Sequence, residues 1–143
     1  MDLVALTYIS RSAPALTPQD VDAIHRAALT YNPLDGITGL LIFNGNGFMQ
    51  IIEGAESAID DLMTRITADI RHVDLEVRDR RSLTERCFPH WNMHRVDVST
   101  SFERGLAEIE HAVEEIIDAP MRAMIGNSLA AISTPSTLVP ASP

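Results

Sequence analysis

The chain has 143 residues, of which 45% are hydrophobic and 22% are charged, a size and composition typical of one globular domain. The chain has eleven arginines and twenty acidic residues, and the resulting net charge of -9 argues against a surface that binds nucleic acid. No apolar run approaches the roughly 20 residues of a membrane span, and no signal-peptide pattern is present. The single cysteine, Cys87, excludes an internal disulfide. We therefore expect a cytoplasmic protein that does not enter a membrane.

Hydrophobic periodicity predicts nine elements along the chain. Their order begins β-α-β-β-α-β-β and ends in two further helices. The first six elements match a ferredoxin-like sandwich, an α+β fold with two helices on one face of a sheet. The two C-terminal helices then cover the other face or bind the sheet of a partner. We predict strands over residues 4–10, 37–43, 47–54, 73–78 and 92–98, and helices over residues 17–31, 56–70, 100–120 and 124–132.

The first strand and the first helix each place a polar side chain on a buried face. Alternation along residues 4–10 puts Tyr8 on the same face as its apolar neighbours. Helical spacing along residues 17–31 brings Asn32 into line with the apolar stripe of the helix. The stretch from Pro33 to Gly36 is expected to break this helix.

A glutamine, Gln50, lies in the middle of the apolar strand over residues 47–54. Phe48 and Ile52 share its face, so we expect its side chain to be buried. A buried amide without partners costs roughly 1–3 kcal/mol, and Gln50 therefore requires hydrogen bonds from other side chains, a water or a ligand.

Charged residues follow the second helix. Arg71 and His72 are expected to close it, because cations are favourable near a helix C-terminus, and Asp69 lies on its flank. The next strand alternates apolar and charged residues, as a half-exposed strand does. Arginines along and beyond this strand are interpreted as a solvated edge, with anion binding as the alternative: Arg78, Arg80, Arg81 and Arg86.

The residues that could carry chemistry are neutral rather than charged. His90 and His94 lack an obvious third metal ligand, and no serine or cysteine has the pattern of an activated nucleophile. What remains is Tyr8, Asn32 and Gln50, each of which alone has an ordinary structural role. Together they suit recognition of a flat polar ring, because amides both donate and accept hydrogen bonds.

Five segments occur in an order and spacing that resemble a known family: Tyr8-Ile9-Ser10, Asn32, Phe48-x-Gln50-x-x-Glu53-Gly54, Arg71-His72 and Trp91-x-Met93. Across about residues 2–97 the chain resembles the BLUF domain, the blue-light sensor that uses FAD. Without an effector domain it looks like a short BLUF protein. The resemblance divides it into a flavin-binding domain (1–98), a helical extension (99–133) and a tail expected to be disordered (134–143).

The resemblance also implies the cofactor and the residues that bind it. The cofactor is FAD, with FMN or riboflavin as alternatives, and its ring lies between the two helices of the sandwich. No metal is implied. The implied cofactor-binding residues are Tyr8, Ser10, Asn32, Gln50, Asp69, Arg71 and His72.

By the same resemblance the chain is a photoreceptor and not an enzyme. Tyr8 gives an electron and a proton to the excited flavin, and Gln50 relays the proton and ends rotated or tautomerised, which shifts the flavin absorption to the red. Trp91 and Met93 then pass the change to the last strand and the C-terminal helices. The receiver is a homo-oligomer, which the apolar positions of the helix over residues 100–120 make plausible, or an unidentified downstream signalling protein.

Two other readings stay open from the sequence. In the first, the chain is a small flavin-dependent reductase in which Tyr8 and Gln50 only bind the ring. In the second, it is a ferredoxin-like interaction module without a ligand. Bound flavin and a reversible red shift in blue light would separate the photoreceptor from both.

Overall fold

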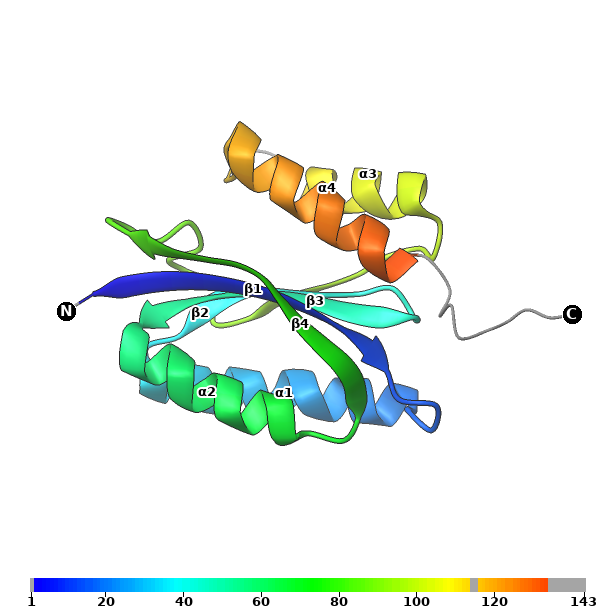
Figure 1. Cartoon of the computed structure of the whole chain (residues 1–143), viewed down its shortest axis with the longest axis horizontal. Helices are drawn as coiled ribbons and strands as arrows, with labels where there is room; N and C mark the ends of the chain where they lie inside the picture. Colours follow the sequence, from blue (N-terminus) through cyan, green and yellow to red (C-terminus); the bar gives the residue numbers. More distant parts are fainter. Residues whose placement is uncertain (1, 114–115, 134–143) are drawn as a thin grey trace, which may run out of the picture.

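The structure, a computed structural model, describes residues 2–113 and 116–133. Within these residues a five-stranded sheet lies between two pairs of helices (Figure 1). This architecture is a ferredoxin-like α+β sandwich with a second helical layer, which confirms the predicted fold class. The elements are β1 (Leu3–Ser12), α1 (Pro18–Asp35), β2 (Thr38–Phe43), β3 (Gly47–Ala55), α2 (Glu56–Ala68), β4 (His72–Leu83), β5 (His94–Asp97), α3 (Phe102–Val113) and α4 (Ala119–Ser133).

Hydrogen bonding orders the sheet β4-β1-β3-β2-β5, so β3 is its central strand. All neighbouring strands are antiparallel except β2 and β5, which are parallel. The register makes Tyr8 of β1 and Leu41 of β2 the direct neighbours of Gln50. A polar side chain at this position is therefore enclosed by strands on both sides.

The two faces of β3 belong to two different hydrophobic cores. Phe48 and Ile52, on the face of Gln50, pack toward α1 and α2, as the alternation of the sequence predicts. Met49 and Ile51 pack toward α3 and α4 on the other face. The C-terminal helices thus cover the chain's own sheet (Figure 1). The buried apolar residues of these helices and of their connection are Ile109, Val113, Ile117, Met121, Ile125, Leu129 and Ile132.

Helix α1 is longer than predicted, because Pro33 does not break it. A proline inside a helix removes one backbone hydrogen bond and crowds the carbonyl four residues earlier, yet the helix continues through Pro33 to Asp35. It ends at Gly36, which adopts the left-handed conformation (φ 67°) and donates its N–H to the carbonyls of Asn32 and Pro33. Asn32 consequently lies inside the last helical turn and not after it.

The connection between α2 and β4 also differs from the prediction. α2 ends at Ala68 instead of residue 70, and His72 is the first residue of β4, from where its ring hydrogen-bonds the carbonyl of Ile66 in the last turn of the helix. β4 extends to Leu83, well past the predicted end at residue 78. Its pairing with β1 is interrupted by two register shifts, and Asp74 next to one of them has a positive φ of 55°.

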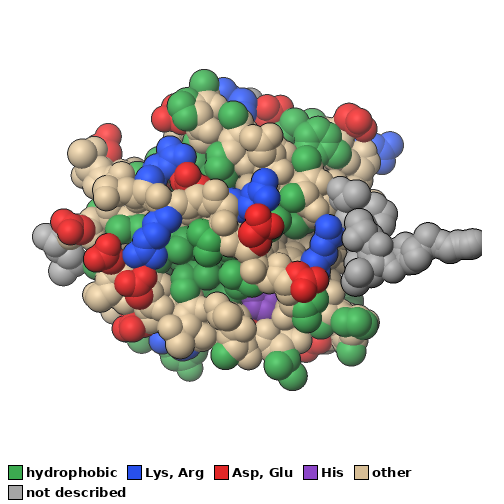
Figure 2. Space-filling model, in the orientation of Figure 1, with side chains coloured by type: hydrophobic (Ala, Val, Ile, Leu, Met, Phe, Trp, Pro, Cys, Tyr) green, Lys and Arg blue, Asp and Glu red, His purple; other side chains and the backbone are tan. Residues whose placement is uncertain are grey.

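Most of the arginines along β4 form ion pairs on the surface, so they belong to a solvated edge. Figure 2, in the orientation of Figure 1, shows blue and red side chains next to one another on this face with an apolar area between them. Arg86 differs, because it donates hydrogen bonds to the protein backbone. The pairs are Arg78–Glu76, Arg80–Glu56, Arg80–Asp60 and Arg81–Asp79.

The C-terminal part is divided differently from the prediction. β5 covers only residues 94–97, and α3 ends at Val113 instead of residue 120. Pro120 lies in the first turn of α4, where the missing N–H has no intrahelical partner to lose, so it begins a helix and does not end one. The predicted tail over residues 134–143 lies outside the described residues. Across the described ranges, no helix is long and apolar enough to cross a membrane.

Candidate functional site

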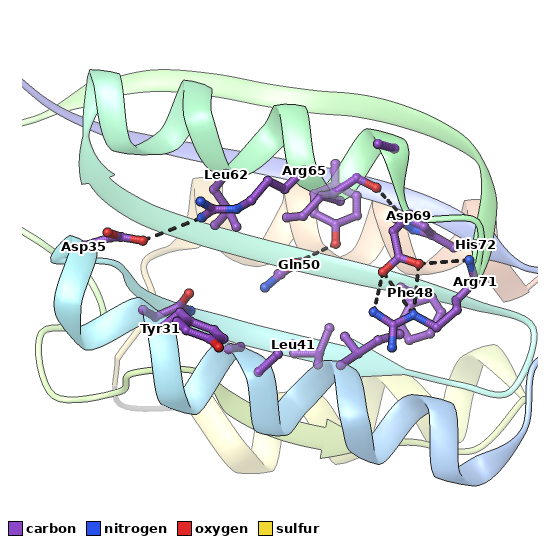
Figure 3. Close-up of a pocket in the computed structure, with 17 residues that line it drawn as sticks. Tyr31, Asp35, Leu41, Phe48, Gln50, Leu62, Arg65, Asp69, Arg71 and His72 are labelled. Carbon is purple, nitrogen blue, oxygen red and sulfur yellow. Dashed lines mark hydrogen bonds and ion pairs between the residues drawn. The ribbon is translucent and has the colours of Figure 1, made fainter.

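A cavity of about 790 Å³ lies between α1, α2 and the sheet (Figure 3). Leu41 and Phe48 of the sheet form its floor, with Gln50 between the two helices. Ile24 and Ala28 of α1 and Leu62 and Ile66 of α2 contribute apolar walls. An apolar slot with a few polar groups at its floor and ends is the usual form of a small-molecule site.

Gln50 is held at both ends of its amide inside the protein. The hydroxyl of Tyr8 donates to Oε1 of Gln50 at 2.5 Å, and Nε2 of Gln50 donates to the sulfur of Met93 at 3.3 Å. Both bonds are buried, and Gln50 itself is 6% exposed. The requirement for partners that the sequence imposes is thus met by a phenol and a thioether.

The environment of Tyr8 keeps its hydroxyl protonated. Burial, and after it the negative charge of Asp69, raises the pKa of Tyr8 well above its usual range. The neutral phenol can then act as a hydrogen-bond donor to Gln50 at any physiological pH.

Asn32 lines the cavity and also binds the segment that leads into β5. Its Nδ2 donates to the carbonyl of Asn92 at 3.0 Å, while within the described residues its Oδ1 has no partner. Two turns earlier on α1, Nε2 of His25 donates to the carbonyl of Met93 at 2.9 Å. The sequence did not point to His25, because a half-buried histidine on a helix gives no signal of its own.

Asp69 and Arg71 form a rigid pair at one end of the cavity (Figure 3). The guanidinium donates from Nε and Nη2, with its shortest contact at 2.7 Å, and the backbone N–H of Arg71 donates to Oδ1 of Asp69. These hydrogen bonds hold the pKa of Asp69 below its usual range. The carboxylate therefore stays ionised and fixes the direction in which the guanidinium points.

His72 lines the cavity, whereas Ser10 is not among the residues that line it. Nε2 of His72 donates to the carbonyl of Ile66 at 2.7 Å, and Nδ1 is hydrogen-bonded to the Ser10 hydroxyl, also at 2.7 Å. This pair joins the end of α2 to β1 and orients the ring beside Phe48 and Tyr8.

A second ion pair, which the sequence analysis did not identify, spans the opposite end of the cavity. Arg65 of α2 lies 3.6 Å from Asp35 of α1, and both side chains are substantially exposed (Figure 3). Tyr31, beside Asn32, also lines this end of the cavity and is 59% exposed. One signal in the sequence could have pointed to Arg65: it precedes Asp69 by four residues, and residues at this spacing share a helical face.

Trp91 and Met93 are separated by the sheet. Met93 lies in the core on the cavity side, next to Gln50. Trp91 packs against the core under α3 and α4, where it is stacked on Phe88 with ring centroids 5.5 Å apart and lies 4.3 Å from the ring of His94. Of the two residues predicted to relay a signal, only Met93 contacts Gln50.

The residues of the cavity fit a flavin. An isoalloxazine ring needs two apolar flanks and hydrogen-bonding groups at its polar edge. Ala28 and Leu62 provide flanks from the two helices, and Oδ1 of Asn32 and the amide of Gln50 provide polar atoms. Arg71 supplies a positive charge at one end for a ring carbonyl or phosphate.

Comparison with known proteins gives a family and several relatives. The family model for BLUF, sensors of blue light using FAD, matches residues 3–94. The chain is 36% identical over 92 residues to the photoactivated adenylate cyclase subunit beta of Euglena gracilis and 34% identical over 86 residues to subunit alpha of the same organism. These matches cover 64% and 60% of this chain but only 11% and 8% of the relatives, so the chain spans about a tenth of their length.

Solved structures resemble the chain over a greater part of its length. The dark-state structure of the BLUF protein BlrB is 35% identical with a TM-score of 0.70, and the match covers 91% of this chain and 96% of that chain. Klebsiella pneumoniae BlrP1, in a manganese and cyclic diGMP complex, is 32% identical with a TM-score of 0.75, covering 90% of this chain and 33% of that chain.

Proposed function

The chain belongs to the BLUF family of blue-light sensors, and on that premise we propose that it is a flavin photoreceptor whose response is driven by Tyr8 and Gln50. BLUF domains are photosensors and not themselves enzymes, and the family description names FAD, which implies a flavin cofactor. The observation that carries the proposal is the buried hydrogen-bonded series from Tyr8 through Gln50 to Met93.

Two polar groups of this chain would hold the cofactor. Asn32 offers Oδ1 as an acceptor and the second N–H of Nδ2 as a donor, because only one N–H of that amide is used by the carbonyl of Asn92. Arg71, fixed by Asp69, offers its remaining guanidinium N–H groups. When bound, a flavin supplies absorption of blue light and a strongly oxidising excited state.

Tyr8 is the donor in this proposal. It is buried, neutral and in direct hydrogen bond with Oε1 of Gln50, so the loss of an electron from the phenol releases its proton to that oxygen. When the electron returns, the phenol recovers its proton. No substrate is consumed, and the lasting product is a changed arrangement of the Gln50 amide.

A change at the amide of Gln50 reaches Met93 directly. The thioether sulfur of Met93 accepts a hydrogen bond but cannot donate one. If the amide rotates, its oxygen replaces Nε2 at the sulfur and the hydrogen bond is lost. Met93 is adjacent to His94, the first residue of β5, so the loss acts at the beginning of the edge strand.

The C-terminal helices are the proposed output. Val98 follows β5, and its N–H donates to the carbonyl of Phe43 at 2.9 Å before α3 begins at Phe102. The apolar residues of α3 and α4 are mostly buried on the chain's own sheet, so a second copy or a downstream signalling protein would bind their polar outer surface. The relatives from Euglena gracilis, named as photoactivated adenylate cyclase subunits, are much longer chains, of which the matched region is a small part.

A light-minus-dark absorption spectrum of the purified protein tests the proposal. We expect a yellow protein whose flavin absorption shifts to the red in blue light and returns in the dark. Gln50→Leu, which removes both amide atoms, is expected to retain flavin but to lose the shift. A flavin that nicotinamide reduces readily without any red shift would favour a reductase, and a colourless protein that refuses added FAD would contradict flavin binding.

A further inference from the structure

Glu53 is a fully buried carboxylate that the proposed photochemistry does not use. It is 0% exposed and lies on β3, three residues from Gln50 and therefore on the opposite face of the sheet. Acidic side chains are almost never fully buried unless they are paired. The burial of Glu53 consequently requires partners that compensate for lost hydration.

Those partners are backbone N–H groups of the loop between β4 and β5. Oε2 of Glu53 accepts from the N–H of Cys87 at 2.8 Å, and Oε1 accepts from the N–H of Phe88 at 2.9 Å. The hydroxyl of Thr38 is a more distant donor at 3.4 Å. Arg86 donates to the backbone carbonyl of Glu53 at 2.9 Å and to the Thr38 hydroxyl at the same distance. The carboxylate thus fastens this loop to the central strand.

The fastened loop carries an aromatic series that ends at β5. Phe88 is 1% exposed and belongs to the core that α3 and α4 cover. Its ring is nearly parallel to that of Trp91, with an angle of 13° between their planes, and Trp91 lies against His94, the first residue of β5. The position of Phe88 therefore determines where Trp91 and the start of β5 sit relative to the C-terminal helices.

We propose that Glu53 is a positioning residue for signal output, which holds Phe88 and Trp91 so that a movement of Met93 displaces α3 and α4. The proposal rests on the proposed function. β3 fastens the connection between β4 and β5 on both sides of the sheet, at Met93 through Gln50 and at Phe88 through Glu53. With the second attachment in place, the loop cannot absorb a displacement at Met93, and the displacement passes to the helices.

Glu53→Gln tests this role with a change of almost no volume. An amide has one oxygen where the carboxylate has two, so the N–H of Cys87 or of Phe88 loses its acceptor. Thr38→Val is the matched control, because it removes the hydroxyl that contacts Oε1 of Glu53 and accepts from Arg86, but leaves both loop N–H bonds to the carboxylate. The bond from Arg86 to the backbone carbonyl of Glu53 also remains.

Three measurements on the flavin-loaded protein separate photochemistry from output. The first is the flavin red shift. The second is acrylamide quenching of tryptophan fluorescence in the dark and in blue light, which reports on Trp91 alone because the chain has one tryptophan. The third is the light-induced change in hydrogen exchange of α3. We expect Glu53→Gln to keep the red shift and to lose at least half of the two other light responses, and Thr38→Val to keep all three.

The outcomes distinguish this inference from the proposed function. A Glu53→Gln protein whose Trp91 quenching and α3 exchange respond to light as in the wild type would overturn the positioning role while leaving the photoreceptor proposal intact. A wild type without a red shift would overturn both. If Glu53→Gln does not fold, Phe88→Leu interrupts the same aromatic series, and a full light response of α3 in Phe88→Leu would overturn the inference.

Discussion

The hydroxyl of Tyr8 donates to Oε1 of Gln50 at 2.5 Å, and the two residues are direct partners in the pairing of β1 with β3. Cross-strand partners keep a fixed separation, because the ladder hydrogen bonds on either side hold their backbones in register. The phenol is thus presented to the amide by the sheet itself. This relationship gives the proposed photochemistry its first test.

Tyr8→Phe is expected to abolish the flavin red shift. The phenylalanine ring keeps the shape of the buried side chain but has no hydroxyl proton to give to Gln50. The measurement is a light-minus-dark absorption spectrum of the flavin-loaded variant. Tyr31→Phe is the control, because Tyr31 is the chain's other tyrosine and lines the same cavity, and it should retain the shift. A normal red shift in Tyr8→Phe would rule out the donor role.

The raised pKa of Tyr8 predicts a loss of stability at high pH. The unfolded chain ionises this phenol from about pH 10, whereas burial keeps it protonated in the folded state. The contribution of the protonated Tyr8 phenol to the free energy of unfolding is therefore complete below about pH 10 and is lost as the pH rises toward the pKa of the folded state. Above pH 10 the free energy of unfolding of the wild type should fall more steeply than that of Tyr8→Phe, by about 1.4 kcal/mol per pH unit. Parallel pH profiles from urea unfolding would contradict this prediction.

Met93→Leu is expected to uncouple the flavin from β5. Leucine fills a similar volume but offers no sulfur to accept from Nε2 of Gln50. The red shift should persist, while the light-induced change in hydrogen exchange across β5 and α3 should shrink. Met63→Leu, in the same core but without a hydrogen bond to Gln50, serves as the control. Equal exchange changes in wild type and Met93→Leu would argue against the route through Met93.

Asp69→Asn is expected to weaken flavin binding. The amide cannot pair with Arg71 as an anion does, so the guanidinium is no longer fixed at the end of the cavity. We expect a several-fold faster loss of flavin during gel filtration or dialysis. Asp79→Asn removes the same type of pair, with Arg81, away from the cavity and should leave flavin retention unchanged. Equal retention in the two variants would speak against a binding role for the Asp69–Arg71 pair.

The contribution of the C-terminal helices to the stability of the fold can be measured by substituting Ile109. It is 0% exposed at the centre of the core between α3 and the sheet, so Ile109→Ala should lower the free energy of unfolding by about 2–5 kcal/mol. Ile116→Ala is the control at an exposed position and should cost about 0.5 kcal/mol. Similar urea midpoints for the two variants would show that the helices contribute little to the stability of the sheet.

Local periodicity was sufficient to predict most of the elements and the two faces of the central strand. The alternation around Gln50 placed Phe48 and Ile52 on one side and Met49 and Ile51 on the other, as observed. Element ends were less predictable. Proline is favoured in the first turn of a helix and disfavoured inside one, so Pro120 is compatible with the start of α4, whereas α1 continues through Pro33 against this preference.

By itself the sequence determined that a phenol and two amides face buried positions, since residue type and periodicity are local properties. Only the tertiary structure decided which of these atoms meet. Strand register brought Tyr8 to Gln50, and the path of the chain between β4 and β5 brought Met93 to the same amide and Phe88 to Glu53 on the other face. Such pairings depend on contacts between residues far apart in the chain, and local propensity carries no information about them.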